Sequence, residues 1–234
     1  MKMKEFDIGI IGALEDEVAE LISKLEGHEV VKLGSVDFHT GKIFGKSVVV
    51  AKCGVGKVFA AICAEAMIIG FAPKLIVNTG VGGALVKGLS VTDTVIADKL
   101  VQHDMDTSPI GDPVGLISGI NKIWFETDER AREILACAAE SLGLRVKIAS
   151  VASGDKFIAD KADKDKITES FGAAVCEMEG AAIAHTAFVN DTPFIVIRAI
   201  SDSADEGSSM DYMTFMPIAA KNSAALTLEL VKNY

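Results

Sequence analysis

Acidic side chains that could donate or accept protons follow several apolar runs of this sequence. Three of them occupy residues 15–17, separated by residues 12–14 from the run at residues 8–11, and Asp202 comes after a strongly apolar run at residues 194–200. A carboxylate at a partly buried strand end tends to have a raised pKa, which a general acid needs. Residues 15–17 also suit the first turn of a helix, where the helix dipole favours negative charge, so position alone assigns none of them a catalytic role.

A second pair of carboxylates, Glu177 and Glu179, follows the short apolar run at residues 174–176. Side chains two positions apart point to different sides of a strand or a helix, so we expect at most one of this pair to face a cleft. Separated carboxylates without a metal motif suit hydrolysis of a glycosidic bond. One acid protonates the leaving group, while another activates water and stabilises the positive charge that develops on the sugar.

Three glycine-rich segments of the sequence resemble phosphate-binding motifs only in part. GKIFGKS from Gly41 has three residues between its glycines where a P-loop has four, so it predicts a hairpin or a strand-linking turn. GVGKV from Gly54 predicts a turn at a helix N-terminus, whose N–H groups could hold an anion or a ligand hydroxyl. GVGGAL from Gly80 misses the third glycine of the dinucleotide fingerprint, and either close approach of a ligand or tight packing would explain its glycines.

The cysteines and histidines predict neither a metal site nor a disulfide framework. The cysteines are scattered, with no CxxC pair, which indicates reduced, buried thiols in a cytoplasmic protein. The segment HDMD from His103 has no second histidine close by and predicts a solvated loop. His28, His39 and His185 are isolated in the sequence and are assigned no role. We expect no metal and no cofactor.

Short β-branched runs alternate with longer amphipathic stretches along the chain. The expected strands are residues 8–11, 47–51, 75–77, 94–97, 146–151, 174–176 and 194–200. The expected helices are residues 15–25, 58–69, 128–142, 161–170, 180–189 and 212–231. This alternation predicts a single α/β domain over residues 1–234, with a central, mostly parallel or mixed sheet flanked by helices. In such sheets ligands bind outside the carboxyl ends of the strands, where the acidic residues and glycines gather.

Composition and charge narrow the classes of partner. The 234 residues are 50% hydrophobic and carry a net charge of −10, so we expect no binding to nucleic acid or to an anionic membrane surface. The apolar residues 8–14 run straight into acidic residues, which predicts a first strand and not a signal peptide, and no apolar run is long enough to span a membrane. Residues 102–120 form a long irregular stretch, as expected of a lid, an interface or a specificity loop.

Several segments resemble, in the right order, motifs of the 5′-methylthioadenosine/S-adenosylhomocysteine nucleosidases, within the nucleoside phosphorylase superfamily. They are GIIGALEDEV around Glu17, GVGKV from Gly54, NTGVGG from Asn78, SGDKFI from Ser153, CEMEGAAIAH from Cys176 and RAISDSAD from Arg198. The resemblance implies a nucleoside phosphorylase-like fold. It also implies hydrolysis of the N-glycosidic bond of 5′-methylthioadenosine, S-adenosylhomocysteine and related 5′-substituted adenosines, which releases adenine and a 5-substituted ribose.

The same resemblance implies catalytic roles at individual positions. Asp202 is similar to the acid that protonates purine N7, with Ser201 orienting it. Glu17 is similar to the residue that binds and deprotonates the attacking water. Glu179 is similar to the residue that bonds the ribose hydroxyls and stabilises the oxocarbenium-like sugar.

Substrate-binding roles and a partner are implied in the same way. Met178 matches the residue that packs under the ribose, Phe157 the ring that stacks on adenine, and Ile158 the residue whose backbone reads the base edge. The other pocket positions are Val55, Val81, Gly82 and Tyr212. Such enzymes are homodimers in which a loop of one subunit closes the other's pocket, and residues 102–120 would be that loop here.

This chain departs from the family pattern around the 5′ end of the substrate. Val81 stands where the family often has serine and Leu14 where it often has methionine, while Ile110 and Asp112 stand where aromatic residues are expected. Methylthio, homocysteinyl, 5′-deoxy and futalosine-type substituents therefore stay open. Two other functions also stay open, a phosphate-dependent phosphorylase and a non-catalytic nucleoside-binding protein. The carboxylates at residues 15–17 argue against the first, because they would repel phosphate.

Overall fold

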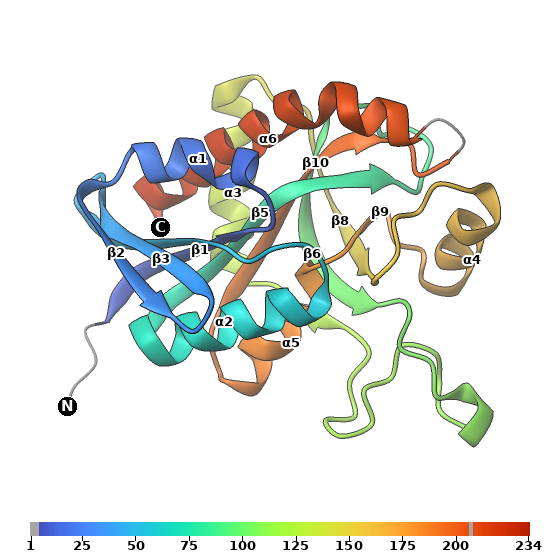
Figure 1. Ribbon diagram of the computed structural model, residues 1–234. Helices are drawn as coiled ribbons and strands as arrows, with labels where there is room; N and C mark the ends of the chain where they lie inside the picture. Colours follow the sequence, from blue (N-terminus) through green and yellow to red (C-terminus); the bar gives the residue numbers. More distant parts are fainter. Residues whose placement is uncertain (1–4, 206–207) are drawn as a thin grey trace.

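The computed structural model describes residues 5–205 and 208–234, which form one sheet with helices on both sides (Figure 1). The strands are β1 (Phe6–Gly12), β2 (Glu26–Leu33), β3 (Val36–Ile43), β4 (Lys46–Lys52), β5 (Pro73–Ala84), β6 (Thr94–Gln102), β7 (Phe125–Glu126), β8 (Val146–Ser153), β9 (Val175–Glu177) and β10 (Phe194–Asp202). The helices are α1 (Glu15–Ser23), α2 (Lys57–Phe71), the 3-10 helix η1 (Ser108–Ile110), α3 (Glu129–Leu142), α4 (Lys161–Phe171), α5 (Gly180–Val189) and α6 (Ser208–Asn233). The α/β class predicted from the sequence is confirmed.

The sheet is mixed, and five of its strands form a closed circuit of pairings. The order β10-β6-β8-β9-β5-β1-β4-β3-β2 is joined back on itself because β10 also pairs with β5. Strand β5 pairs in parallel with β1 and β10, whereas β9 runs antiparallel to it. The carboxyl ends of β1, β5 and β10 therefore meet at one edge of the sheet, where the loops that follow them converge.

Two apolar clusters attach helices to opposite faces of the sheet. Strand side chains such as Ile8 and Val50 pack with Leu21 of α1, Leu135 of α3 and Leu230 of α6 in one cluster. The other cluster holds α2 and α5, which lie together under the opposite face in Figure 1. These buried contacts hold the strand ends, and hence the loops that carry the acidic residues, in fixed positions.

Strand β5 is longer than the sequence indicated. Residues 78–83 were expected to follow a strand at residues 75–77, but they continue it, because β10 pairs with them in register from Val196 opposite Asn78 to Ile200 opposite Gly82. Several of these glycines allow close packing. A Cβ at Gly82 would lie 2.6 Å from a methyl group of Val175, and one at Gly83 would lie 2.8 Å from Asp202 Oδ1. Tight packing, one of the two explanations kept open, therefore accounts for these two glycines.

The hairpin of β2 and β3 was not predicted from the sequence. Strand β2 is exposed along almost its whole length, so it lacks the apolar alternation that indicates a strand. Its pairing with β3 brings His28 and His39 together, with Nε2 of the first 2.8 Å from Nδ1 of the second. The expectation that these histidines are isolated was wrong. The turn predicted after Gly41 is confirmed, since Phe44 and Gly45 form a two-residue connection from β3 to β4.

The surface carries a long irregular segment and one exposed cysteine. Residues 102–120 are irregular apart from η1 and extend away from the body of the molecule in Figure 1. Cys137 is exposed, so the expectation of buried thiols is wrong at this position, whereas Cys53, Cys63 and Cys176 are buried. Within residues 5–205 and 208–234, no helix combines the length and apolar character needed to cross a bilayer.

Candidate active site

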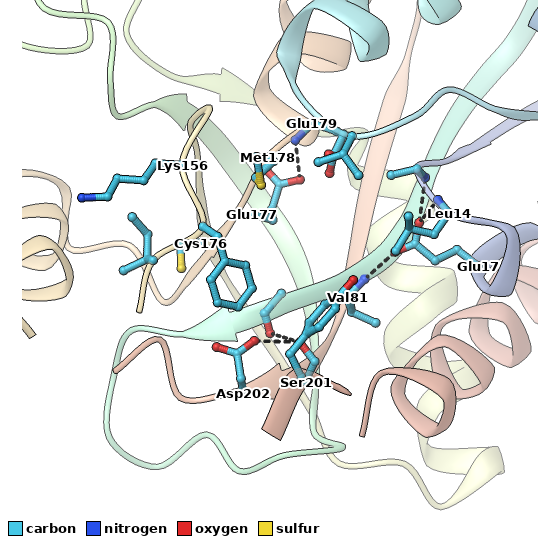
Figure 2. Close-up of a pocket in the computed structure, with 16 residues that line it drawn as sticks. Leu14, Glu17, Val81, Lys156, Cys176, Glu177, Met178, Glu179, Ser201 and Asp202 are labelled. Atoms are coloured by element: carbon cyan, nitrogen blue, oxygen red, sulfur yellow. Dashed lines mark hydrogen bonds between the residues drawn. The ribbon is translucent and has the colours of Figure 1, made fainter. Parts of the chain in front are cut away.

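A cavity of about 380 Å³ opens at the carboxyl ends of the central strands, and every residue assigned to the site from the sequence lines it. The lining residues are Ala13, Leu14, Glu17, Val55, Val81, Gly82, Lys156, Phe157, Ile158, Cys176, Glu177, Met178, Glu179, Ser201, Asp202 and Tyr212. Figure 2 shows Glu17, Glu179 and Asp202 on three different sides of this cavity. Its volume is typical of a small-molecule site.

Glu17 enters the cavity from the first turn of α1. Its Oε2 atom accepts hydrogen bonds from the N–H groups of Ala13 at 2.7 Å and Leu14 at 2.9 Å, and Oε1 accepts one from Val81 at 3.2 Å. Burial raises the pKa of Glu17, and the Arg198 charge and the backbone N–H groups only partly oppose this. A fixed carboxylate with a raised pKa is a better base toward water than an ordinary one.

A bulge near the end of β10 places Asp202. Ile200 pairs with Gly82 and Asp202 pairs with Gly83, so Ser201 is an extra residue in the strand. Ser201 Oγ donates to Asp202 Oδ2 at 2.9 Å, and the Ala204 N–H donates to Oδ1 at 2.8 Å. Burial raises the pKa of Asp202, and these hydrogen bonds only partly offset the effect. The group therefore retains a proton at higher pH than an ordinary aspartate, as a general acid must.

Glu179 precedes α5, and its side chain contacts the residue before α2. Its Oε1 atom accepts a hydrogen bond from the Gly56 N–H at 2.8 Å. Burial and the neighbouring Glu177 charge raise the pKa of Glu179 to about 7, against the opposing Arg198 charge. The turn at Gly54 was expected to offer its N–H groups to a ligand. That expectation was wrong for Gly56 and Lys57, because these N–H groups are bonded to Glu179 and Asp155.

Beneath the cavity, Arg198 and Glu177 form an ion pair that sequence reasoning missed. Arg198 Nε donates to Glu177 Oε2 at 3.1 Å, and both side chains are 2% exposed. Glu177 also accepts hydrogen bonds from Ser153 Oγ and from the N–H groups of Glu179 and Gly180. Both glutamates line the cavity, contrary to the expectation that at most one would, but their carboxylates have different partners: that of Glu177 is bound to Arg198 and that of Glu179 to the Gly56 N–H. Residues 21 positions apart on separate strands gave no local signal of this pairing.

Apolar and aromatic groups form the remaining walls. The rings of Phe157 and Tyr212, which both line the cavity, meet edge to face with centroids 5.6 Å apart. Met178 and Ile158 come from the segments that carry Glu179 and Phe157. Lys156 was not predicted as a lining residue. Its ammonium points away from the carboxylates in Figure 2 and forms an ion pair with Asp163.

No metal-binding cluster accompanies these residues. In the part of the chain that the structure describes, no group of three or more His, Cys, Asp or Glu side chains is arranged to hold a metal ion. The segment from His103 is less solvated than expected. Nε2 of His103 is buried without a hydrogen-bond partner among the described residues, its ring packs against Gly154, and Asp104 pairs with Lys57.

Comparison with known proteins decides the family. The family model described as Phosphorylase superfamily matches residues 7–232. The chain belongs to the phosphorylase superfamily. Among solved members, the 5′-methylthioadenosine/S-adenosylhomocysteine nucleosidase of Neisseria meningitidis, in complex with methylthio-immucillin-A, is similar with a TM-score of 0.95 and 36% identity. That match covers 97% of this chain and 99% of the other.

Two further structures of this superfamily fold are close to the chain. The native futalosine hydrolase of Helicobacter pylori has a TM-score of 0.93 and 34% identity, over 98% of each chain. The S-adenosylhomocysteine nucleosidase of Streptococcus pyogenes has a TM-score of 0.94 and 31% identity, over 100% of this chain and 99% of the other. The resemblance drawn from the sequence motifs is confirmed, and these superfamily neighbours are nucleosidases and a related hydrolase.

Proposed function

We propose that this chain is a nucleosidase that hydrolyses the N-glycosidic bond of 5′-methylthioadenosine, S-adenosylhomocysteine and related 5′-substituted adenosines. The observation that carries the proposal is the placement of three enclosed carboxylates on different sides of one cavity (Figure 2). Nucleoside cleavage needs an acid at the base, a stabiliser at the sugar and a base for water. The names of the solved relatives point to the same class of reaction.

In the proposed reaction, protonated Asp202 gives its proton to N7 of the purine. The C1′–N9 bond then breaks with its electron pair moving into the base, so that adenine leaves without a negative charge. Ser201 holds the Asp202 carboxyl in place through the 2.9 Å hydrogen bond. Phe157 would stack on the base, and the backbone of Ile158 would read its edge, while Val81 and Gly82 lie along the wall of the cavity.

In the same reaction, Glu179 would stabilise the sugar and Glu17 would activate the water. Ionised Glu179 would bond the ribose hydroxyls and stabilise the positive charge on the sugar, with Met178 packed against the ring. Glu17 would accept a proton from water as the water oxygen forms its bond to C1′, which gives the 5-substituted ribose. Val55 and Tyr212 would contact the 5′ substituent, together with residues 102–120 of a second subunit.

Water is favoured over phosphate as the nucleophile because the cations near the cavity are already paired. Arg198 is bound to Glu177 and Asn78, and Lys156 is bound to Asp163. A phosphate dianion would therefore meet the carboxylates of Glu17 and Glu179 without a free counter-charge from these two residues. A phosphorylase is the alternative that this arrangement disfavours.

Purified protein in phosphate-free buffer tests this function. We expect 5′-methylthioadenosine to yield free adenine and a reducing sugar at a rate that added phosphate does not change. A strict phosphate requirement would instead identify a phosphorylase. A panel with S-adenosylhomocysteine, 5′-deoxyadenosine and a futalosine-type nucleoside ranks the substrates, since similarity to the futalosine hydrolase makes that substrate the second candidate. Binding of these nucleosides without any cleavage would identify a non-catalytic binding protein.

We also propose that the chain acts as a homodimer. Apolar side chains are exposed along α2 and α5, among them Val58, Ile62, Ile69 and Val189, and Ile110 on loop 102–120 is 82% exposed. A contiguous apolar face of this kind marks an interface. Light scattering should give twice the 24.7 kDa chain mass. The Ile62→Asp variant should be monomeric, whereas Ile148→Asp, which alters an exposed isoleucine of β8, should not.

A further inference from the structure

Three charged residues outside the cavity form a closed set of contacts beside it. The Lys57 N–H donates to Asp155 Oδ1 at 2.8 Å, the Asp155 N–H donates to Asp104 Oδ2 at 2.9 Å, and the Lys57 ammonium donates to Asp104 Oδ1 at 2.5 Å. We call Lys57, Asp104 and Asp155 the Asp104 cluster. It ties together the first residue of α2, the segment after β6 and the segment after β8.

The Asp104 cluster is joined to Glu179 through a single residue, Gly56, which lies between the two bonded N–H groups. Gly56 donates its N–H to Glu179 Oε1, and the next N–H along the chain, that of Lys57, is the one held by Asp155. Gly56 has a φ of 102°, a conformation that favours glycine, and a Cβ there would lie 3.1 Å from Asp155 Oδ1. Since Gly56 has no side chain to anchor it, the contacts of Lys57 with Asp155 and Asp104 fix the direction of the Gly56 N–H.

We propose that the Asp104 cluster positions the carboxylate of Glu179 against the sugar of the substrate. This inference rests on the ribose-binding role proposed for Glu179. Lys57, Asp104 and Asp155 are positioning residues, because they are absent from the lining of the cavity and act through Gly56. The ammonium of Lys57 and the carboxylate of Asp104 are 18% and 32% exposed, so solvent only partly screens their attraction.

The cluster also connects Glu179 to loop 102–120. Asp104 lies near the start of that loop, and Lys57 Nζ donates a further hydrogen bond to Gln102 Oε1 at 3.3 Å. The same loop that would reach the neighbouring subunit is therefore anchored beside the sugar site of its own subunit. A change in the position of residues 102–104 would move the Gly56 N–H and, with it, the Glu179 carboxylate.

The Asp104→Ala variant of the full chain tests the proposal, with 5′-methylthioadenosine as substrate and adenine as a competing ligand. We expect kcat/KM to fall about tenfold to a hundredfold, the range for a catalytic group displaced by about 1 Å. The inhibition constant of adenine should not change, because the base is held at the other side of the cavity. Lys57→Met should reproduce the loss and Lys57→Arg should restore most of the activity. Asp165→Ala, on α4 and outside both the cavity and loop 102–120, should match the parent, since the Asp165 carboxylate forms a surface pair with Lys161.

A double-mutant cycle separates positioning from general damage to the structure. In a Glu179→Ala background, Asp104→Ala should cause no further loss, because the group it positions is gone. An equal loss in both backgrounds, or a matching loss of adenine binding, would overturn the role of the Asp104 cluster. If Asp104→Ala does not fold, the same cycle is run with Lys57→Met. A Glu179→Ala variant that keeps the parent rate would instead overturn the proposed role of Glu179 itself.

Discussion

Arg198 and Glu177 face each other beneath the cavity as a fully enclosed ion pair, with Nε of the arginine 3.1 Å from Oε2 of the glutamate. The remaining donors of Arg198 bind Asn78 and the carbonyl of Ile197, so its guanidinium is saturated by protein groups. Its charge still lowers the pKa values of Glu17 and Glu179 against the effect of burial. One buried cation therefore acts on both carboxylates that would handle the sugar and the water.

Replacing Glu177 by glutamine should destabilise the fold strongly. The substitution keeps the size of the side chain but leaves Arg198 without its ionised partner, and breaking a buried pair in this way costs about 3 to 5 kcal/mol. Urea unfolding followed by circular dichroism measures the loss. Glu126→Gln, which breaks the exposed pair with Lys122, should cost about 1 kcal/mol or less. Equal losses of unfolding free energy in the two variants would show that the buried pair stabilises the fold no more than the exposed one.

Asp202→Asn should fold like the parent and lose about two to four decades of kcat, because the amide cannot give a proton to the purine. Adenine release from 5′-methylthioadenosine measures the rate, and thermal unfolding checks the fold. Asp37→Asn, on the exposed β2–β3 hairpin, is the matched control and should leave the rate unchanged. A fully active Asp202→Asn variant would require a different acid.

Gly80→Ala should impair the hydrolytic step through Glu17. A Cβ at Gly80 would lie 2.6 Å from Glu17 Oε1, and Glu17 is buried and held by three N–H groups, so it has little room to move. Displacement of this group by about 1 Å should cost about a hundredfold in kcat. Gly119→Ala introduces the same methyl group where no atom of this chain lies within 4 Å and should leave kcat unchanged, so that an effect through loop 102–120 would be confined to KM. Comparable activity of the two variants would contradict the proposed crowding.

Glu179→Gln should become more stable relative to the parent as pH rises. The pKa of Glu179 is raised from 4.5 to about 7, so the folded state binds this proton more tightly than the unfolded chain does. Its contribution to stability is present below 4.5 and is lost as pH rises through about 7, by up to about 3 kcal/mol. Thermal unfolding of both proteins from pH 4.5 to 8 measures the difference. A difference that is constant with pH would contradict the raised pKa.

The sequence predicted which strands end in the acidic residues of the cavity, but it did not predict the long-range contacts that hold those residues in place. Apolar runs followed by Glu17 and Asp202 indicated where side chains meet, because parallel strands end at a common edge. The pairing of Arg198 with Glu177 could not be predicted from the sequence, since it depends on two strands that come together only in the closed circuit of the sheet. The N–H of Gly56 was expected to be free for a ligand for the same reason: its partner Glu179 lies 123 positions away.

Strand periodicity failed where exposure removes the pattern that a strand normally shows. The edge strand β2 is solvent-exposed, so its residues need no alternation of apolar and polar side chains. The glycines of β5 led to a strand that was predicted too short, because a run of glycines normally indicates a turn. Here Gly80 and Gly83 lie in a paired strand and leave room for the side chains of Glu17 and Asp202.

Because Gly80 and Gly83 belong to the same paired strand and lie against Glu17 and Asp202, β5 sets the spacing between these two carboxylates. Three residues of extended chain span about 10 Å, and the pairing of this segment with β10 holds it extended. Insertions or substitutions in loop 102–120, which lies outside this strand, would therefore leave the spacing of Glu17 and Asp202 unchanged. The sequence of loop 102–120 can therefore vary while β5 keeps the two carboxylates in the same relative positions.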